Sequence, residues 1–248
     1  MDPNRLKELG LLPAWRIRPG AIPGQPSVQL PAASSAGAPA VEDALSAEDR
    51  TAVIARAGWD QLRQRVSSCT ACPLSQTRKQ TVFGVGDEQA DWLFIGEGPG
   101  AREDELGEPF VGQAGKLLDN MLQTIHLERG KNVYIANIVK CRPPGNRNPL
   151  DAEAEQCRPY LLRQIALIQP RLIVALGKVA AQNLLATDAS IASLRGRLHE
   201  FSGIPLIVTY HPAYLLRSLA DKAKAWEDLC FARATMQAMQ NLPAVPRL

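Results

Sequence analysis

The sequence lacks any apolar run long enough to cross a membrane, and its N-terminus carries Asp2 and Glu8 where a secretory signal would be uninterrupted and apolar. It also lacks a strong charge of either sign, since 28 Lys and Arg oppose 25 Asp and Glu for a net charge of +3. We therefore expect a cytoplasmic protein. A nucleic-acid partner is compatible with this charge, but it would have to bind local basic patches.

Cysteine is sparse, with five residues at uneven spacing. Cytoplasmic thiols stay reduced, which favours metal ligands over disulfides. Cys69 and Cys72 form a C-x2-C pair, and Cys141 and Cys157 form a C-x15-C pair. Four thiolates suffice for zinc or for an iron–sulfur cluster, so the pattern leaves both open. Cys230 has no partner in this scheme, and we interpret it as a core residue.

The first part of the chain is poor in the residues that build a core. Residues 19–40 are mostly Pro, Ala, Gly and Ser, with no charged residue after Arg18. Such a composition is typical of a linker. We interpret residues 1–50 as an N-terminal extension with a flexible Pro/Ala-rich linker and residues 51–248 as one folded domain.

Four largely apolar runs, rich in β-branched and aromatic residues, predict strands covered on both faces; they lie at residues 91–96, 132–139, 171–177 and 205–210. Helical patterns lie at residues 113–126, 151–169, 178–186 and 223–240. The alternation predicts a three-layer α/β/α sandwich with a central, mostly parallel four-stranded sheet. Residues 197–208 can add a hairpin with Ser202 and Gly203 at its turn.

Ligands of such folds bind beyond the carboxyl ends of the strands. The first predicted strand delivers Glu97 among glycines, the second delivers Asn137 and the last delivers His211. "GEGPG" lacks the dinucleotide spacing, and "GQAGKL" has Leu117 where a P-loop requires Ser or Thr. We therefore expect a ligand site at this edge that does not use a nucleoside triphosphate.

Two segments beyond the strands are candidates for contact with nucleic acid. Lys140, Arg142 and Arg147 form a basic cluster without intervening acids, which suits a phosphate backbone. A merely solvated loop is the alternative.

The second segment follows His211. Leu215 and Leu216, followed by Arg217, suit a wedge between base steps with a phosphate contact. The first turn of a packed helix explains the same pattern equally well.

Taken together, "CTACPL", "GEGPG", "PFVGQAGKLL", "NIVKCRPPGNR", Cys157 and "HPAYLLR" resemble the family 4 uracil-DNA glycosylases, over roughly residues 58–240. The resemblance implies a [4Fe-4S] cluster on Cys69, Cys72, Cys141 and Cys157. It also implies base excision repair: uracil is flipped out of DNA and its N-glycosidic bond is hydrolysed, which leaves an abasic site.

By this resemblance Phe110 stacks on the uracil face and Asn137 reads the uracil edge through N3–H and O4. His211 and backbone N–H groups near Gly98 would stabilise the uracil anion as an oxyanion hole does. The cluster would be structural, because glycosidic hydrolysis moves no electrons.

The resemblance leaves two alternative roles open for the carboxylate of Glu97. Glu97, supported by Glu103, can position water, or Glu97 can crowd the uracil C5 position and exclude thymine. Asp104, Glu105 and Glu108 are expected to be solvated.

Two other classes of protein remain open: a non-catalytic, polymerase-associated DNA-binding module and a zinc-stabilised nucleic-acid protein. As partner we expect uracil-containing DNA, single- or double-stranded, bound by a monomer. The N-terminal extension is a candidate segment for recruiting a replication or repair partner.

Overall fold

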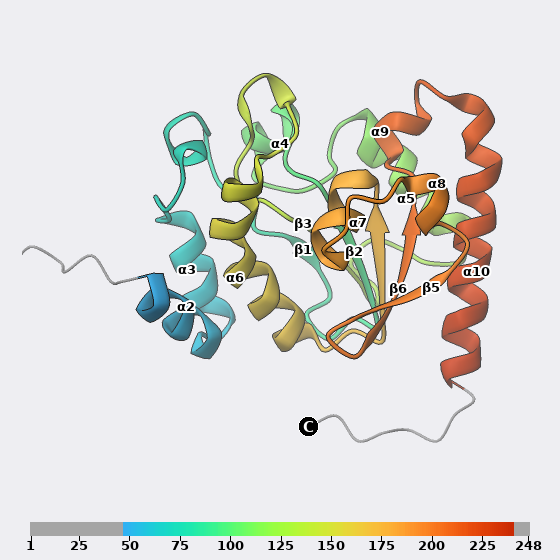
Figure 1. Cartoon of the computed structure of the whole chain (residues 1–248), viewed down its shortest axis with the longest axis horizontal. Coiled ribbons are helices and arrows are strands. Elements are labelled where there is room, and N and C mark those ends of the chain that lie inside the picture. The colour runs from blue at the N-terminus through green and yellow to red at the C-terminus, as the bar shows by residue number, and fades with distance from the viewer. Residues whose placement is uncertain (1–46, 241–248) are drawn as a thin grey trace, which may run out of the picture. The chain divides into compact units, whose positions relative to one another are not determined.

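The computed structural model describes residues 47–240 of the chain (Figure 1). The predicted extension, residues 1–50, lies almost entirely outside the described residues, so its boundary and its role stay predictions. Within the described part, no helix is both long enough and apolar enough to cross a membrane.

Six strands form one sheet in the order β1-β3-β2-β4-β6-β5. The four inner strands run parallel; they are β2 (Trp92–Gly96), β3 (Val133–Asn137), β4 (Leu172–Leu176) and β6 (Ile204–Thr209). They correspond to the four predicted strands, so the mostly parallel centre is confirmed. The predicted total of four is wrong, because antiparallel β1 (Val85–Gly86) and β5 (Leu198–Phe201) extend the two edges.

The predicted hairpin is the origin of one edge strand. β5 pairs with β6, and Ser202 and Gly203 form the turn with positive φ values of 52° and 80°. The other edge strand, β1, has only two residues. A pattern of alternating polarity needs a longer segment, so the sequence carried no signal for β1.

The predicted helices are present as α5 (Gln113–Thr124), α6 (Asp151–Ile168), α7 (Lys178–Leu185) and α10 (Lys222–Gln240). The described residues also form α2 (Ala47–Arg56), α3 (Trp59–Ser67), α4 (Ala101–Leu106), α8 (Ile191–Leu194), α9 (Pro212–Leu215) and the 3-10 turns η1 (Pro73–Gln76), η2 (Pro144–Asn146) and η3 (Leu219–Asp221).

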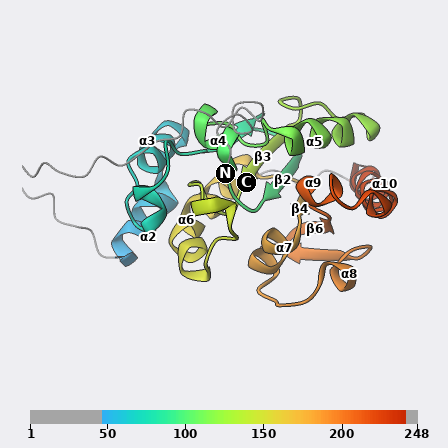
Figure 2. The same cartoon turned by 90° about the horizontal axis from the view of Figure 1, so that it is seen from above.

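Helices cover both faces of the sheet, because alternate residues of a strand point to opposite faces. In β2, Leu93 and Ile95 pack in one core with residues of α2, α3, α6 and α7. Trp92 and Phe94 pack in the other core with residues of α5, α9 and α10. Figure 2 shows α6 and α7 on one side of the strands and α5 and α10 on the other. The three-layer sandwich is therefore confirmed.

The chain changes direction at β2, and this determines where a ligand can enter. It passes from β2 to β3 through α5 on one face and from β3 to β4 through α6 on the other. β2 therefore lies between the strands that precede and follow α6, and its carboxyl end is a topological switch point. Glu97 immediately follows that end.

The acidic segment after β2 is more ordered than predicted. Residues 101–106 form α4, which ends at Gly107 in the left-handed conformation (φ 77°). Asp104 is buried, and its Oδ1 accepts the backbone N–H groups of Lys79 and Gln80 at 2.9 and 3.4 Å. The expectation of a solvated Asp104 is therefore wrong, because this carboxylate holds a loop that is distant in sequence.

Candidate active site

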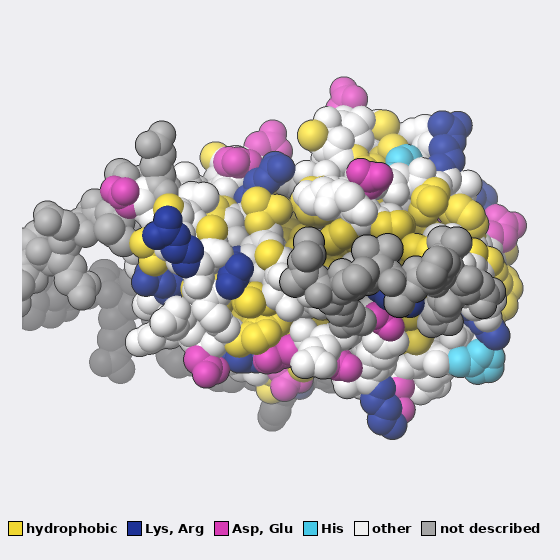
Figure 3. All heavy atoms as spheres, turned by 90° about the horizontal axis from the view of Figure 1, so that it is seen from below, with side chains coloured by type: hydrophobic (Ala, Val, Ile, Leu, Met, Phe, Trp, Pro, Cys, Tyr) yellow, Lys and Arg dark blue, Asp and Glu magenta, His cyan; other side chains and the backbone are white. Residues whose placement is uncertain are grey.

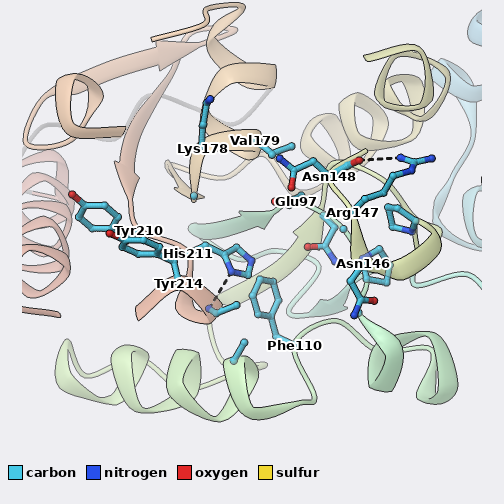
Figure 4. A pocket seen from close by; sticks show the side chains of 18 of the residues that line it. Glu97, Phe110, Asn146, Arg147, Asn148, Lys178, Val179, Tyr210, His211 and Tyr214 are labelled. Atoms are coloured by element: carbon cyan, nitrogen blue, oxygen red, sulfur yellow. Dashed lines mark hydrogen bonds between the residues drawn. The ribbon is translucent and has the colours of Figure 1, made fainter. Parts of the chain in front are cut away.

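The carboxyl ends of β2, β3 and β6 open onto one cavity of about 770 Å³ (Figure 4). Its wall includes the residues that the sequence had singled out from separate segments, namely Glu97, Gly98, Glu103, Phe110, Asn137 and His211. In β2 and β3 the paired residues at the rim are Gly96 and Asn137. The parallel register thus brings side chains that are far apart in sequence to one edge of the sheet.

Asn137 is 2% exposed, and its side-chain Oδ1 has no hydrogen-bond partner within the described residues. A buried acceptor without a donor costs about 1–3 kcal/mol. The amide lies close against the neighbouring strand, since a Cβ at Gly96 would come 2.5 Å from Oδ1. Oδ1 is therefore an acceptor suited to a donor on a ligand.

His211 occupies the N-cap position of α9, with Pro212 beginning the helix. Its Nδ1 accepts the backbone N–H of Ala213 at 3.1 Å, so the neutral ring carries its proton on Nε2. Burial, aided by the positive charge of Arg217 and opposed by Glu103, lowers the pKa of His211 to about 4. At neutral pH the ring is thus an uncharged Nε2–H donor on the cavity wall.

Phe110 forms the wall next to His211. Its side chain is 6% exposed, and the two ring centroids lie 5.5 Å apart at an interplanar angle of 31°. Figure 4 shows the two rings side by side below the ends of the strands. A flat ligand can lie on the Phe110 face while its edge meets polar groups.

The two predicted carboxylates differ in what they bind. Glu97 is half-buried, its carboxylate has no hydrogen-bond or ion-pair partner among the described residues, and burial raises its pKa. Oε1 of Glu103 accepts the backbone N–H groups of Val111 and Gly112, both at 3.0 Å. Glu103 lines the cavity and its Oε1 secures the Phe110 loop, so its expected part in the chemistry stays a prediction.

Two of the residues predicted to contact DNA are buried. Lys140 is 1% exposed, its Nζ donates to the backbone oxygen of Asn137 at 2.9 Å, and burial lowers its pKa to about 8. Leu215 is also 1% exposed and packs in the core on the α5 and α10 side. Lys140 as a phosphate contact and Leu215 as a wedge are therefore both wrong, because neither side chain reaches the surface.

The other predicted DNA contacts are accessible. Arg147 is exposed and bonds Glu153 through both terminal nitrogens at 2.6 and 2.9 Å; Arg142 is partly exposed and bonds Asn146. Leu216 (43% exposed) and the exposed Arg217 follow the buried Leu215. On the face drawn in Figure 3, side chains of both charges are interspersed, in line with the small net charge.

Sequence reasoning missed two parts of the cavity wall. Lys178 is exposed at the start of α7, directly after β4. Tyr210 stacks on Tyr214, with centroids 5.2 Å apart at 18°. Both follow carboxyl ends of strands, which was an available signal. Gly177, which precedes Lys178, packs closely against the site, since a Cβ there would lie 2.7 Å from Cβ of His211.

The four paired cysteines line a second, small cavity, even though they come from three segments of the chain. All four are free thiols, and N–H donors point at three sulfurs: Arg50 at Cys69 (3.8 Å), Arg78 at Cys141 (3.0 Å) and the backbone of Lys140 at Cys157 (3.3 Å). Donors of this kind stabilise thiolates.

The geometry of these cysteines bears on the choice of metal. No three His, Cys, Asp or Glu side chains in the described part of the chain form a group that could hold a single metal ion.

Cys230 is exposed on α10, so its interpretation as a core residue is wrong.

Comparisons with known proteins agree with this arrangement. A family model described as the uracil DNA glycosylase superfamily matches residues 83–230. The chain is 45% identical over 165 residues to a type-4 uracil-DNA glycosylase of Archaeoglobus fulgidus, covering 63% of this chain and 82% of that protein. It is 40% identical over 177 residues to one of Pyrobaculum aerophilum (68% and 90% covered) and 44% identical over 163 residues to one of Thermotoga maritima (65% and 84%).

The family model covers more than half of the chain, and the aligned segments span most of each relative. The resemblance drawn from the motifs is thereby confirmed. The chain belongs to the uracil DNA glycosylase superfamily and, within it, to the type-4 family.

Proposed function

We propose that this protein is a DNA repair enzyme that releases uracil from DNA by hydrolysing the bond between the base and its sugar. The observation that carries the proposal is buried Asn137, whose Oδ1 has no partner among residues 47–240, on a cavity wall that also holds an aromatic face. A base inside a duplex cannot reach this cavity, so the nucleotide must first be flipped out, which costs a few kcal/mol of stacking. Contact with the ring of Phe110 offsets part of that cost.

Asn137 supplies the discrimination among bases. Uracil presents a donor at N3–H and an acceptor at O4, which match Oδ1 and Nδ2 of the amide. Cytosine presents an acceptor at N3 and an amino donor at C4, so Oδ1 would face an acceptor and Nδ2 would face a donor. A buried site built to pair with one pattern rejects the other strongly, because its own polar atoms would be left unpaired.

His211 supplies the stabilisation of charge. When the bond between C1′ and N1 breaks, the electron pair stays on uracil and part of the negative charge accumulates on O2. The Nε2–H of the neutral ring and backbone N–H groups near Gly98 are the proposed donors to O2. Water then adds at C1′ and loses one proton, which leaves the hydroxyl of the abasic sugar, and the uracil anion takes up one proton.

Glu97 is the candidate for placing that water. Its carboxylate has no partner in the part of the chain that the structure describes, and its raised pKa makes it a stronger base than a solvated glutamate. Contacts to the DNA backbone would come from the accessible side chains of Arg147, Lys178 and Arg217, which line the cavity, and of Arg142, which precedes the lining residue Pro143. Leu216 replaces the buried Leu215 as the candidate wedge.

The donor set around the second cavity fits a [4Fe-4S] cluster held by Cys69, Cys72, Cys141 and Cys157. In a cluster each thiolate binds a different iron, so the ligands stand farther apart than around one ion. Such a group would supply a rigid cross-link among segments 69–72, 141 and 157. It would take no part in the hydrolysis, which moves no electrons.

The direct test of the function is release of free uracil from single- and double-stranded oligonucleotides. We expect release by the wild-type protein, and a fall in kcat/KM of at least about 100-fold for Asn137→Ala and for His211→Ala, the scale of one lost donor to a developing anion. His199→Ala and Asn183→Ala, which lie outside the cavity, are the matched controls and should keep wild-type rates. Tight binding of uracil-containing DNA without release would instead establish the non-catalytic module.

The low pKa of His211 predicts a specific pH dependence. The pKa of His211 is about 4 in the folded protein and 6.5 in the unfolded chain, so the unfolded chain binds the second ring proton more readily than the folded protein does. The stability that the neutral ring contributes is therefore complete above pH 6.5 and is lost as the pH falls toward 4. We expect ¹⁵N NMR to show a neutral His211 ring at pH 5.5. We also expect the rate of uracil release to show no change that follows protonation of His211 between pH 5.5 and 8. A titration midpoint between pH 6 and 7 would contradict this.

The metal proposal is tested by analysis of iron and acid-labile sulfide together with the visible absorption spectrum. We expect about four irons and four sulfides per chain and a brown protein. Cys157→Ser should lower the iron content and the melting temperature, whereas the control Cys230→Ser should change neither. Zinc in a colourless protein would reject the cluster.

A further inference from the structure

We propose that Arg129 is a positioning residue for uracil release, because it holds Phe110 in the conformation that presents its ring to the cavity. The inference rests on the proposed role of Phe110 as the stacking surface. Arg129 lies in the loop after α5, it is absent from the cavity wall, and none of the motifs singled out in the sequence contains it.

Phe110 has an unusual backbone. Its φ is 55°, in the left-handed region that residues other than Gly, Asn and Asp seldom occupy. A non-glycine residue stays there only where surrounding contacts over-determine it. The contacts that hold Phe110 therefore decide where its ring points.

Arg129 supplies contacts of this kind. Its Nη1 donates to the backbone oxygen of Pro109 at 2.9 Å and its Nη2 donates to that of Phe110 at 2.8 Å. Its Nε donates to Oδ1 of Asp119 on α5 at 2.9 Å. One planar guanidinium thus ties two consecutive carbonyls to a helix, and a lysine has no comparable fork.

The same turn is closed from two other sides. The backbone of α5 lies so close that a Cβ at Gly115 would come 1.8 Å from the oxygen of Phe110. Glu103 accepts the N–H groups of Val111 and Gly112. The ring itself fits between His211 and the end of β2, where a Cβ at Gly96 would lie 2.6 Å from Cζ of Phe110. Among these contacts, the hydrogen bond to the Phe110 carbonyl itself comes from Arg129.

Removal of the guanidinium should let the Phe110 backbone relax to negative φ and move its ring away from the base. We expect Arg129→Met to lower kcat/KM for uracil release by about tenfold, the size of one weakened base–aromatic stack. Arg129→Lys should recover only part of this loss. Affinity for an oligonucleotide with thymine in place of uracil should be unchanged, because Arg129 does not line the cavity at which DNA is bound.

A double-mutant cycle separates positioning from general stability. If Arg129 acts through the ring, Arg129→Met should lower kcat/KM less than twofold in a Phe110→Leu background. Arg171→Met is the matched control: Arg171 also donates to a backbone carbonyl, that of Met239, but far from the cavity, and its loss should leave release unchanged. Equal losses in the two backgrounds, or an unchanged rate for Arg129→Met, would overturn the inference.

Crystal structures of the wild-type protein and of Arg129→Met give a readout that does not depend on activity. We expect the φ of Phe110 to leave the left-handed region in the variant; an unchanged φ would also overturn the inference. If the wild-type protein released no uracil while Phe110 still moved, the proposed function would fail and the positioning role of Arg129 would stand.

Discussion

The side-chain oxygen of Asn137, unpaired among the described residues, is the constraint on which the rest of the proposed mechanism depends. A buried acceptor without a donor is unfavourable in the free protein, and a ligand that brings an N–H to this position removes that penalty. Gly96 leaves room for the amide, and the parallel pairing of β2 with β3 holds it at the rim. In the proposed mechanism the ring of Phe110 and the Nε2–H of His211 act on the same base from its face and from another edge.

Lys140 joins this pocket to the cysteine cavity. Its Nζ bonds the backbone oxygen of Asn137, and its own N–H bonds the sulfur of Cys157. The residue proposed to read the base and one of the cysteines are therefore connected through a single buried residue, by its side chain on one side and by its backbone N–H on the other. A cross-link among the four cysteines would stiffen the end of β3 as well as the loop that carries Arg142 and Arg147, which explains how a group without electron transfer can still matter for hydrolysis.

Much of this arrangement follows from the sequence, since buried parallel strands are continuous apolar runs and the residue after each run lies at the ligand-binding edge. Glu97, Asn137 and His211 were found in this way. The burial of Lys140 and Leu215 could not be found, because a basic or apolar residue in a short loop has the same local pattern whether it points inward or outward. The left-handed backbone of Phe110 depends on Arg129, nineteen residues away, and no local signal encodes such a contact.

The central claim is that Oδ1 of Asn137 accepts the N3–H of uracil. It is tested most directly by comparing release from single-stranded oligonucleotides that carry uracil or N3-methyluracil, which lacks this donor. The account predicts that methylation slows release by about 100-fold or more in the wild-type protein. It also predicts a much smaller ratio in Asn137→Ala, where the methyl group has room and no acceptor is left unpaired. Equal rates for the two bases in the wild-type protein would contradict the account.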